Sequence, residues 1–209
     1  MKTKNYIIVM GDIINSGKLP QPITQNKFLT HIKEVNATFK NEICSPLTIT
    51  LGDEFQGVVA TVANAVKLVL AIEEKLLINN FPYQLRFVIN QGKIDTPINT
   101  TIAYGMVGEG LTEARKMLEI AKQNKTKYSF GGIKNSEQLK YIFEIFEMFY
   151  SNWEKKKEGK LISQFLLQID YKQIALKMKK TPSLIWKRKK SLHINPYIAL
   201  KKIADECTS

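Results

Sequence analysis

The stretch ITLGDEFQG, residues 49–57, decides the fold of the first part of this chain. An apolar run breaks at Gly52, two acids follow, and apolar residues resume at Phe55. A turn that only joins two strands favours Asn-Gly or Asp-Gly, with glycine second. Here glycine comes first, so that Asp53 and Glu54 follow it directly. We interpret the stretch as a β-hairpin whose tip carries acidic side chains.

The segments around this hairpin predict an α+β fold. Apolar runs rich in Val and Ile indicate strands, and apolar steps of three and four residues indicate helices. We expect strands at residues 5–10, 47–51, 56–62, 83–90, 100–107 and 127–130, a loop at 12–22, and helices at 24–40, 63–77, 108–123 and 135–154. Mixed hairpins and helices favour an α+β sandwich over a doubly wound parallel sheet. The opening order βαββαβ fits a ferredoxin-like sheet.

The positive charge of the chain is concentrated in its last quarter. The net charge is +12, and residues 155–209 contribute +10 of it, with 14 Lys and Arg against 4 Asp and Glu. A basic segment that also carries patterned apolar residues favours a polyanionic partner, DNA or RNA. The run KKKEGK at 155–160 indicates a charged break. We therefore expect an α+β domain at 1–134, a connecting amphipathic helix and basic linker at 135–160, and a basic helical domain at 161–209.

The connecting helix is crowded with aromatic residues. The overlapping face consists of Ile142, Phe143, Phe146, Phe149, Tyr150 and Trp153. Such a face suits a dimerisation or inter-domain helix, and it equally suits an ordinary helix packed on the sheet. The sequence leaves both interpretations open.

Composition excludes several classes of protein. At 209 residues with 44% hydrophobic residues, the chain can bury a core and is not globally disordered. Cys44 and Cys207 lack the spacing of a disulfide framework or a zinc site, and His31 and His193 stand alone. The apolar run near the first residue is too short for a signal peptide or a membrane span. We expect a cytoplasmic protein without membrane insertion.

Two acids follow glycines at the ends of expected strands. If the strands that precede Asp12 and Asp53 are neighbours, both carboxylates emerge at one edge of the sheet and repel unless a proton or a cation neutralises them. Mg²⁺ commonly uses one or two carboxylates together with substrate phosphates. The pattern therefore predicts a Mg²⁺ or Mn²⁺ site that is also a phosphate site, although Asp after Gly is also a common turn former. Glu54 is expected to point to the opposite side.

Three segments carry a resemblance to a known family. GDIINS at 11–16, ITLGDEFQG at 49–57 and RFVINQGKIDT at 86–96 resemble the SatD family over roughly the whole chain. A weaker resemblance connects the chain to class III nucleotidyl cyclases and, through GDEF, to diguanylate cyclases. Their Arg-x-Gly-Ile-x-x-Gly strand is similar to residues 86–92, and their Gly-Asp-x-Val-Asn-x-Ala-x-Arg helix start is similar to residues 108–116.

The cyclase resemblance implies a metal-bound nucleotide. Asp12 and Asp53, with the carbonyl of Ile13, would hold metal ions that bind the phosphates. Gly11, Gly52 and Ile49 would line the nucleotide site. Ile49 stands where cyclases that select adenine carry a lysine.

The catalytic positions of the resemblance are altered. The cyclase Asn that orients the ribose falls on Thr112, and the Arg that stabilises the transition state falls on Lys116, next to Arg115. Lysine supplies charge but not the guanidinium fork. This pattern suits a domain that binds a nucleotide without cyclising it, and it also suits an enzyme with a different reaction. Catalysis thus stays open, with Thr112, Arg115 and Lys116 as the candidates.

The basic segment predicts three or four short helices over residues 161–206, and residues 171–191 resemble a helix-turn-helix. Thr181 would cap the second helix and Pro182 would be its first residue. The candidate DNA-contacting residues are Thr181, Ser183, Lys187, Arg188, Lys189 and Lys190. Lys179 replaces the glycine often found in such a turn, so a degenerate helical bundle that binds a protein is an alternative.

These patterns combine into one reading with two alternatives. A nucleotide or phosphate ligand, bound through a divalent metal, would regulate a DNA-binding segment, as in a transcription regulator. Because cyclase-like sites and helix-turn-helix readers are built from pairs, we expect a homodimer. The alternatives are an active metal-dependent nucleotidyl cyclase or other nucleotidyl enzyme, and a non-catalytic interaction protein in membrane biogenesis.

Overall fold

One mixed sheet organises the protein. In the computed structural model, which describes residues 4–153 and 155–208, five strands lie in the order β2-β3-β1-β4-β5. They are β1 (Asn5–Ile13), β2 (Ile43–Leu51), β3 (Glu54–Val59), β4 (Leu85–Lys93) and β5 (Tyr128–Gly131). Neighbouring strands are antiparallel except β4 and β5, which are parallel. The first four strands have the expected ferredoxin-like order, and β5 extends that sheet.

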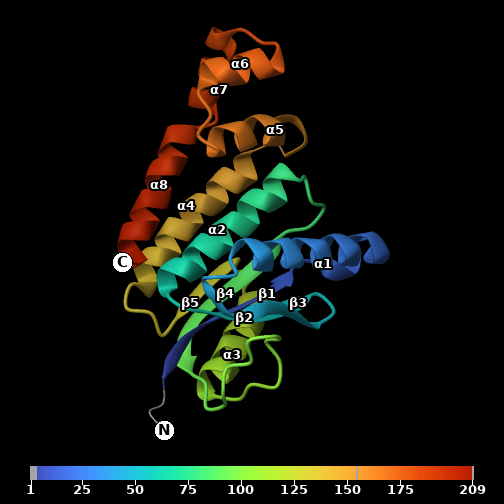
Figure 1. Cartoon of the computed structure of the whole chain (residues 1–209), viewed down its shortest axis with the longest axis vertical. Helices are drawn as coiled ribbons and strands as arrows, with labels where there is room; N and C mark the ends of the chain where they lie inside the picture. The colour runs from blue at the N-terminus through green and yellow to red at the C-terminus, as the bar shows by residue number, and fades with distance from the viewer. Residues whose placement is uncertain (1–3, 154, 209) are drawn as a thin grey trace.

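Helices cover both faces of the sheet. They are α1 (Gln21–Thr38), α2 (Val62–Ile78), α3 (Glu109–Gln123), α4 (Ser136–Asn152), α5 (Lys155–Leu166), α6 (Tyr171–Met178), α7 (Pro182–Ser191) and α8 (Ile194–Thr208), with a short 3₁₀ turn η1 (Ser16–Lys18). Figure 1 shows α2, α4 and α8 running side by side beyond the sheet, with α6 and α7 at the far end. The fold is therefore α+β, as expected.

Alternation along the strands sorts the core into two clusters. Val9, Phe55 and Phe87 point to one face and pack with α1, α2 and α4. Met10 and Val88 point to the other face and pack under α3. Because side chains alternate across a strand, the even-numbered positions of β1 and β4 lie under α3. Asp12 and Arg86 belong to this even-numbered set, which fixes the face on which they lie.

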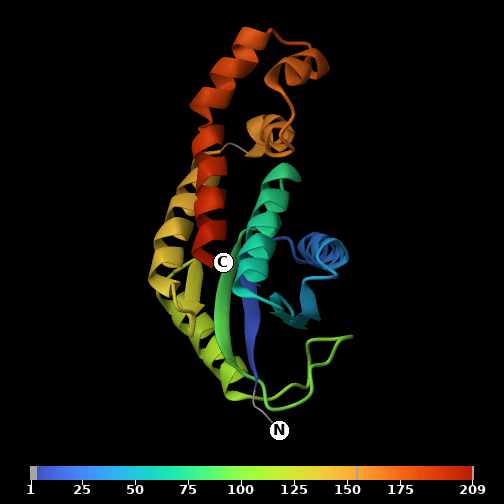
Figure 2. The same cartoon turned by 60° about the vertical axis from the view of Figure 1, so that its left-hand side comes forward.

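The last helices share the core of the sheet domain. α5 packs on α2, and α8 packs on both α2 and α4 (Figure 2). One hydrophobic cluster runs without a break from the sheet to Phe165 and Tyr197. The hydroxyl of Tyr197 lies 2.8 Å from that of Tyr150 and donates to Glu74 at 2.7 Å. Only α6 and α7 project beyond this body, and we call residues 167–193 the basic lobe.

The aromatic face of α4 has partners within the chain. Phe143 contacts the rings of Tyr128 and Phe130 in β5, and Phe146 and Phe149 contact Tyr197 of α8. The face is wide because it packs on two partners, a strand and a helix. This packing supports the interpretation of a helix that lies on the sheet and also holds the C-terminal segment, whereas dimerisation through α4 stays a prediction.

Two predictions about elements were wrong. Residues 100–107 form no strand, and instead side chains of β2 and β3 hold this loop: the Ser45 hydroxyl donates to the Asn99 carbonyl, and Thr48 accepts from the Ala103 amide at 2.9 Å. KKKEGK is not a break, because residues 155–160 are the first half of α5. Strand β1 also continues through Ile13, so that the predicted loop begins later.

Within the described ranges, 4–153 and 155–208, no helix combines the length and the apolar character needed to cross a membrane.

Candidate functional site

The two glycine-aspartate motifs meet at one end of the sheet. Asp12 is the penultimate residue of β1, and the amide of Ile13 donates to the Asp53 carbonyl at 3.1 Å. Gly52 has a φ of 59°, which lets the chain turn tightly before Asp53. The strands that precede Asp12 and Asp53 are not neighbours as expected, because β3 lies between β1 and β2, but β1 and the hairpin tip do lie at one end of the sheet.

Arg86 holds the carboxylate of Asp12. Its Nη1 atom lies 2.9 and 2.8 Å from the two carboxylate oxygens, and its Nε donates to the Thr126 carbonyl at 2.9 Å. Both side chains are buried, at 5% and 7% exposure. Burial raises the pKa of Asp12 above its ordinary value even though Arg86 opposes the shift. The charge of Asp12 is thus compensated inside the protein.

Glu54 lies beside Asp12, contrary to expectation. The two residues are direct cross-strand partners, so their side chains share the α3 face of the sheet. Glu54 pairs with Arg115 and with Lys122, whose Nζ lies 2.6 Å away. Burial raises the pKa of Glu54, but the hydrogen bonds from Lys122 and Arg115 outweigh it and the pKa is lowered. Glu54 therefore fixes α3 over the acidic end of the sheet.

The three candidate catalytic residues differ in their distance from the acidic end of the sheet. Arg115 reaches the acids through Glu54, whereas the side chain of Lys116 is exposed. Thr112 is exposed in the first turn of α3 and lines, with Arg115, a cavity of about 310 Å³. Of these three residues, only Arg115 contacts an acidic residue at this end of the sheet, namely Glu54.

Gly11 and Ile49 have packing roles. A Cβ atom on Gly11 would lie 2.6 Å from the ring of Phe55, so glycine permits the close approach. Ile49 faces Phe55 across the hairpin and packs on the α1 side, away from Asp12. A nucleotide contact from either residue stays a prediction.

A second cavity opens on the other side of the acidic end. It has about 190 Å³ and is lined by Ile13, Ser16, Gly17, Thr24, Gln25, Gly52 and Asp53. Thr24 is 3% exposed, and its hydroxyl has no hydrogen-bond partner among the described residues. An unpaired buried hydroxyl is costly unless a ligand or water completes it. Sequence reasoning missed Thr24, although it follows the start of a helix beside the predicted site.

The acids alone do not make a metal site. Within the described residues, no group of three or more His, Cys, Asp or Glu side chains lies close enough to hold a metal ion. Asp12 and Asp53 are the carboxylates that the sequence predicted. A divalent ion would need phosphate oxygens in addition to them, which fits the coordination habit of Mg²⁺.

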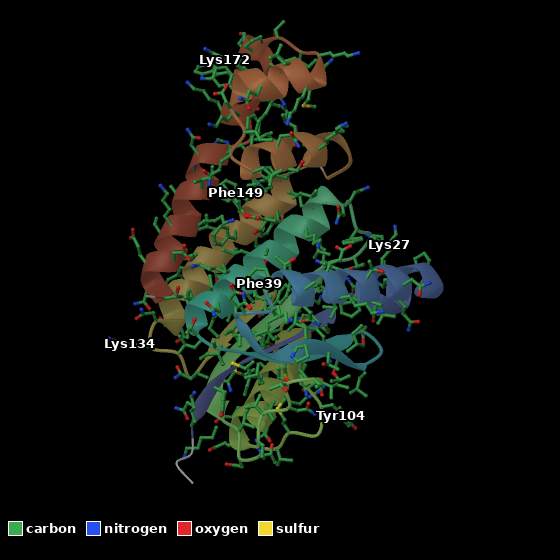
Figure 3. All side chains as sticks on the ribbon, in the orientation of Figure 1. Lys27, Phe39, Tyr104, Lys134, Phe149 and Lys172 are labelled. Carbon is green, nitrogen blue, oxygen red and sulfur yellow. The ribbon has the colours of Figure 1, made fainter. Side chains whose placement is uncertain are left out.

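The basic lobe has the predicted local geometry. The Thr181 hydroxyl accepts from the Leu184 amide at 3.3 Å, and Pro182 is the first residue of α7. Lys179 adopts the left-handed conformation, with a φ of 52°, where a glycine is often found. Ile185 is buried against α6, whereas Lys187 is exposed. Figure 3 shows side chains projecting around this end of the molecule, with Lys172 at its tip.

Comparison with known proteins identifies the family. The chain belongs to the SatD family, whose model matches residues 6–208. No curated protein matches the chain.

Several solved structures resemble part of the chain. A bacterial light-regulated adenylyl cyclase is 16% identical with a TM-score of 0.47, over 62% of this chain and 77% of that one. The adenylyl cyclase CyaB from P. aeruginosa is 14% identical with a TM-score of 0.43, over 57% and 74%. The guanylyl cyclase domain of the RhoGC fusion protein from the aquatic fungus Blastocladiella emersonii is 19% identical with a TM-score of 0.43, over 56% and 74%. Similarities of this size do not define a ligand or an activity.

Proposed function

We propose that the sheet domain binds a phosphorylated ligand, most simply a nucleotide, together with Mg²⁺ or Mn²⁺. The observation that carries the proposal is the unpartnered hydroxyl of buried Thr24, in a cavity that Asp53 and Ile13 also line. Phosphate oxygens are strong acceptors, and a hydroxyl can donate to them. A phosphate would also supply the additional oxygens that a metal ion at Asp53 needs.

Arg86 gives the proposed site a second cation. It pairs with Asp12, so a metal that takes the Asp12 carboxylate would free the guanidinium. A guanidinium matches the planar arrangement of phosphate oxygens. In this arrangement Asp12 and Asp53 would hold the metal ion, which would neutralise charge, and the Thr24 hydroxyl would orient the phosphate.

The test measures ligand binding by the wild type and by variants of the site residues. Isothermal titration with ATP, GTP and inorganic phosphate, with and without Mg²⁺, should give tighter binding with the metal, and Asp53→Asn should remove that difference. Thr24→Val should weaken binding about fivefold or more, the effect of one lost hydrogen bond. Thr30→Val, at an exposed position of the same helix, is the matched control. Absence of binding to all three ligands would refute the proposal.

Nucleic-acid binding by the lobe is a second candidate function. Residues 171–191 contain eight Lys and Arg and no Asp or Glu, and the capped α6–α7 pair carries them on its surface. Ser183 and Lys187 are exposed on α7, whereas Arg188 also pairs with Glu158 of α5. We retain the functional division at 1–134, 135–160 and 161–209 as part of this proposal.

Duplex DNA tests the second candidate. The wild-type protein should bind a labelled duplex with an affinity that falls steeply as salt rises. The double variant Lys187→Glu/Lys189→Glu should bind much more weakly, whereas Lys40→Glu/Lys134→Glu, an equal change of charge at exposed positions of the sheet part, should not. Equal losses in both variants would mean that only net charge matters.

Catalysis is the remaining alternative, and Arg115 is the observation that favours it. A guanidinium fixed by Glu54 beside Asp12 could stabilise charge on a reacting phosphate. Incubation with ATP or GTP and Mn²⁺ decides the matter. Turnover that Asp53→Asn abolishes would replace the binding proposal with an enzymatic one.

A further inference from the structure

A separate cavity lies in the basic lobe, where α6, α7 and α8 meet. It has about 440 Å³ and is lined by Tyr171, Trp186, Lys189, Lys190, His193 and Asn195, among others. This volume is in the range of sites that bind small molecules. None of these residues belongs to the acidic end of the sheet. We call this feature the lobe cavity.

Aromatic rings form part of its wall. Trp186 is 43% exposed, although it is one of the largest apolar side chains of the chain. Tyr171, the first residue of α6, is half-buried and packs against the core. Exposed tryptophan on a basic surface is suited to stacking on a flat ring. An aliphatic ligand would not require such a wall.

Positive charge accompanies these rings. The ammonium of Lys190 lies 3.9 Å from the centre of the Trp186 ring, which is a cation–π contact. Lys189 lines the same cavity and is partly buried. Among the described residues that line the cavity there is no Asp or Glu, so a cationic ligand would find no partner among them. The combination of a flat ring and an anion is what this lining complements.

We propose that the lobe cavity binds a nucleotide, with the base stacked on Trp186 and the phosphate held by Lys189 and Lys190. The nucleotide has two sources with the same chemistry, a free mononucleotide or an unpaired residue of a nucleic-acid strand. A base inside a duplex is already stacked and cannot enter a cavity. The inference goes beyond the proposed function, because it needs neither the sheet-end site nor a helix in the major groove.

The candidate duplex-binding surface and the lobe cavity share Lys189 and Lys190, but they differ at Lys187 and Trp186. Lys187 is exposed on α7 and does not line the cavity, whereas Trp186 does. Lys187→Glu should therefore weaken duplex binding through lost phosphate contact and leave mononucleotide binding unchanged. Trp186→Ala should weaken mononucleotide binding and leave duplex binding unchanged. Absence of duplex binding in the wild type would contradict the DNA candidate and leave this inference standing.

Tryptophan fluorescence provides the measurement. The chain has two tryptophans, and the other one, Trp153, is only 4% exposed. Titration of the full chain with AMP, with a single strand of thymidylates and with a duplex should quench Trp186 for the first two ligands. Isothermal titration, which does not depend on the Trp186 signal, should show that Trp186→Ala binds about fivefold or more weakly, the range for loss of one base-stacking contact. Leu184→Ala, at an equally exposed apolar position of α7, should bind as the wild type does.

The outcomes separate the two sources and define failure. Similar affinity for AMP and for the strand supports a free nucleotide, and a much tighter strand supports a nucleic acid. Absence of quenching by either ligand overturns the proposal, and so does equal binding by Trp186→Ala and Leu184→Ala. Circular dichroism of both variants confirms that each is folded, since both positions are partly exposed.

Discussion

His31 is fully buried between α1 and the segment that leads into β4. Its Nδ1 lies 3.3 Å from the Tyr83 hydroxyl, its ring lies 5.1 Å from that of Phe81, and its Nε2 has no partner among the described residues. Burial lowers the pKa of His31 to about 4, with a further contribution from Lys75. The sequence showed only that this histidine stands alone, and the structure places it in the packed interior.

The depressed pKa of His31 predicts a pH-dependent stability. Between pH 6.5 and 4 the unfolded chain binds a proton that the folded chain rejects, so the free energy of unfolding falls as the pH falls. The full effect is about 3 kcal/mol at most. Urea denaturation at several pH values should show this fall in the wild type and less of it in His31→Phe. Parallel curves for the two proteins would contradict the prediction.

The buried ion pair of Arg86 and Asp12 leads to a second prediction about single residues. Removal of one partner leaves the other charge buried, which costs about 3–5 kcal/mol. Arg86→Gln should therefore destabilise the protein strongly, as measured by urea denaturation. The double variant Asp12→Asn/Arg86→Gln should recover much of the loss, because it leaves no buried charge. A double variant that loses the sum of both single effects would show that the pair is not coupled.

Thr24 should separate stability from binding. Because its hydroxyl is buried without a protein partner, Thr24→Val should leave the free energy of unfolding unchanged or raise it by about 1 kcal/mol. The same substitution should weaken phosphate binding. A destabilised variant, seen as a lower melting temperature, would mean that the hydroxyl has a structural partner and no ligand role.

At the scale of elements, α3 approaches β4 through two glycines. A Cβ atom on Gly110 would lie 2.6 Å from the backbone of Gly92, closer than real contacts allow. Gly110→Ala should therefore displace the first turn of α3 and cost about 1–3 kcal/mol. Gly17→Ala, where the added atom meets open space, is the matched control in thermal denaturation. Equal melting temperatures would contradict the close approach.

The sequence predicted elements well wherever a regular pattern was long. The apolar runs of β1 and β4 and the helical steps of α2 and α3 gave elements of the correct type. The prediction of a strand at residues 100–107 was wrong. The alternation of these residues resembles that of a strand, but side chains such as Thr48 and Ser45 bind the backbone of this loop. The prediction of a break at KKKEGK was wrong. It rested on the charges of this run, whereas Leu161 and Ile162, which follow in the same helix, pack that helix into the core.

The site was predictable only in part, for a reason of register. Asp12 and Asp53 could be placed at one end of the sheet because each follows a glycine at a strand end, but the face on which each lies could not. The places of Glu54 and Arg86 depend on which residues face each other across β3, β1 and β4, and no local pattern gives that register. Thr24 was missed because a buried hydroxyl without a partner has no signature in the sequence.

At the scale of the whole molecule, the continuous core predicts cooperative unfolding. Trp153 donates to the Leu192 carbonyl at 3.0 Å and contacts the Tyr197 ring, so its fluorescence reports on the junction between α4 and α8. Denaturation followed by this fluorescence and by circular dichroism should give one midpoint. Separate midpoints would show that the C-terminal helices unfold as an independent domain.

The path of the chain through the lobe has a consequence for how such proteins can diversify. α5 leads out of the body and α8 leads back into it, and both helices pack on α2. The basic lobe is therefore an insertion within a closed core, not an appendage at its end. Exposed positions of α6 and α7 can change more freely than Ile174, Ile185 and Leu192, which belong to the same hydrophobic cluster as the sheet. The surface of the lobe can therefore vary while the packing that keeps the chain folded stays the same.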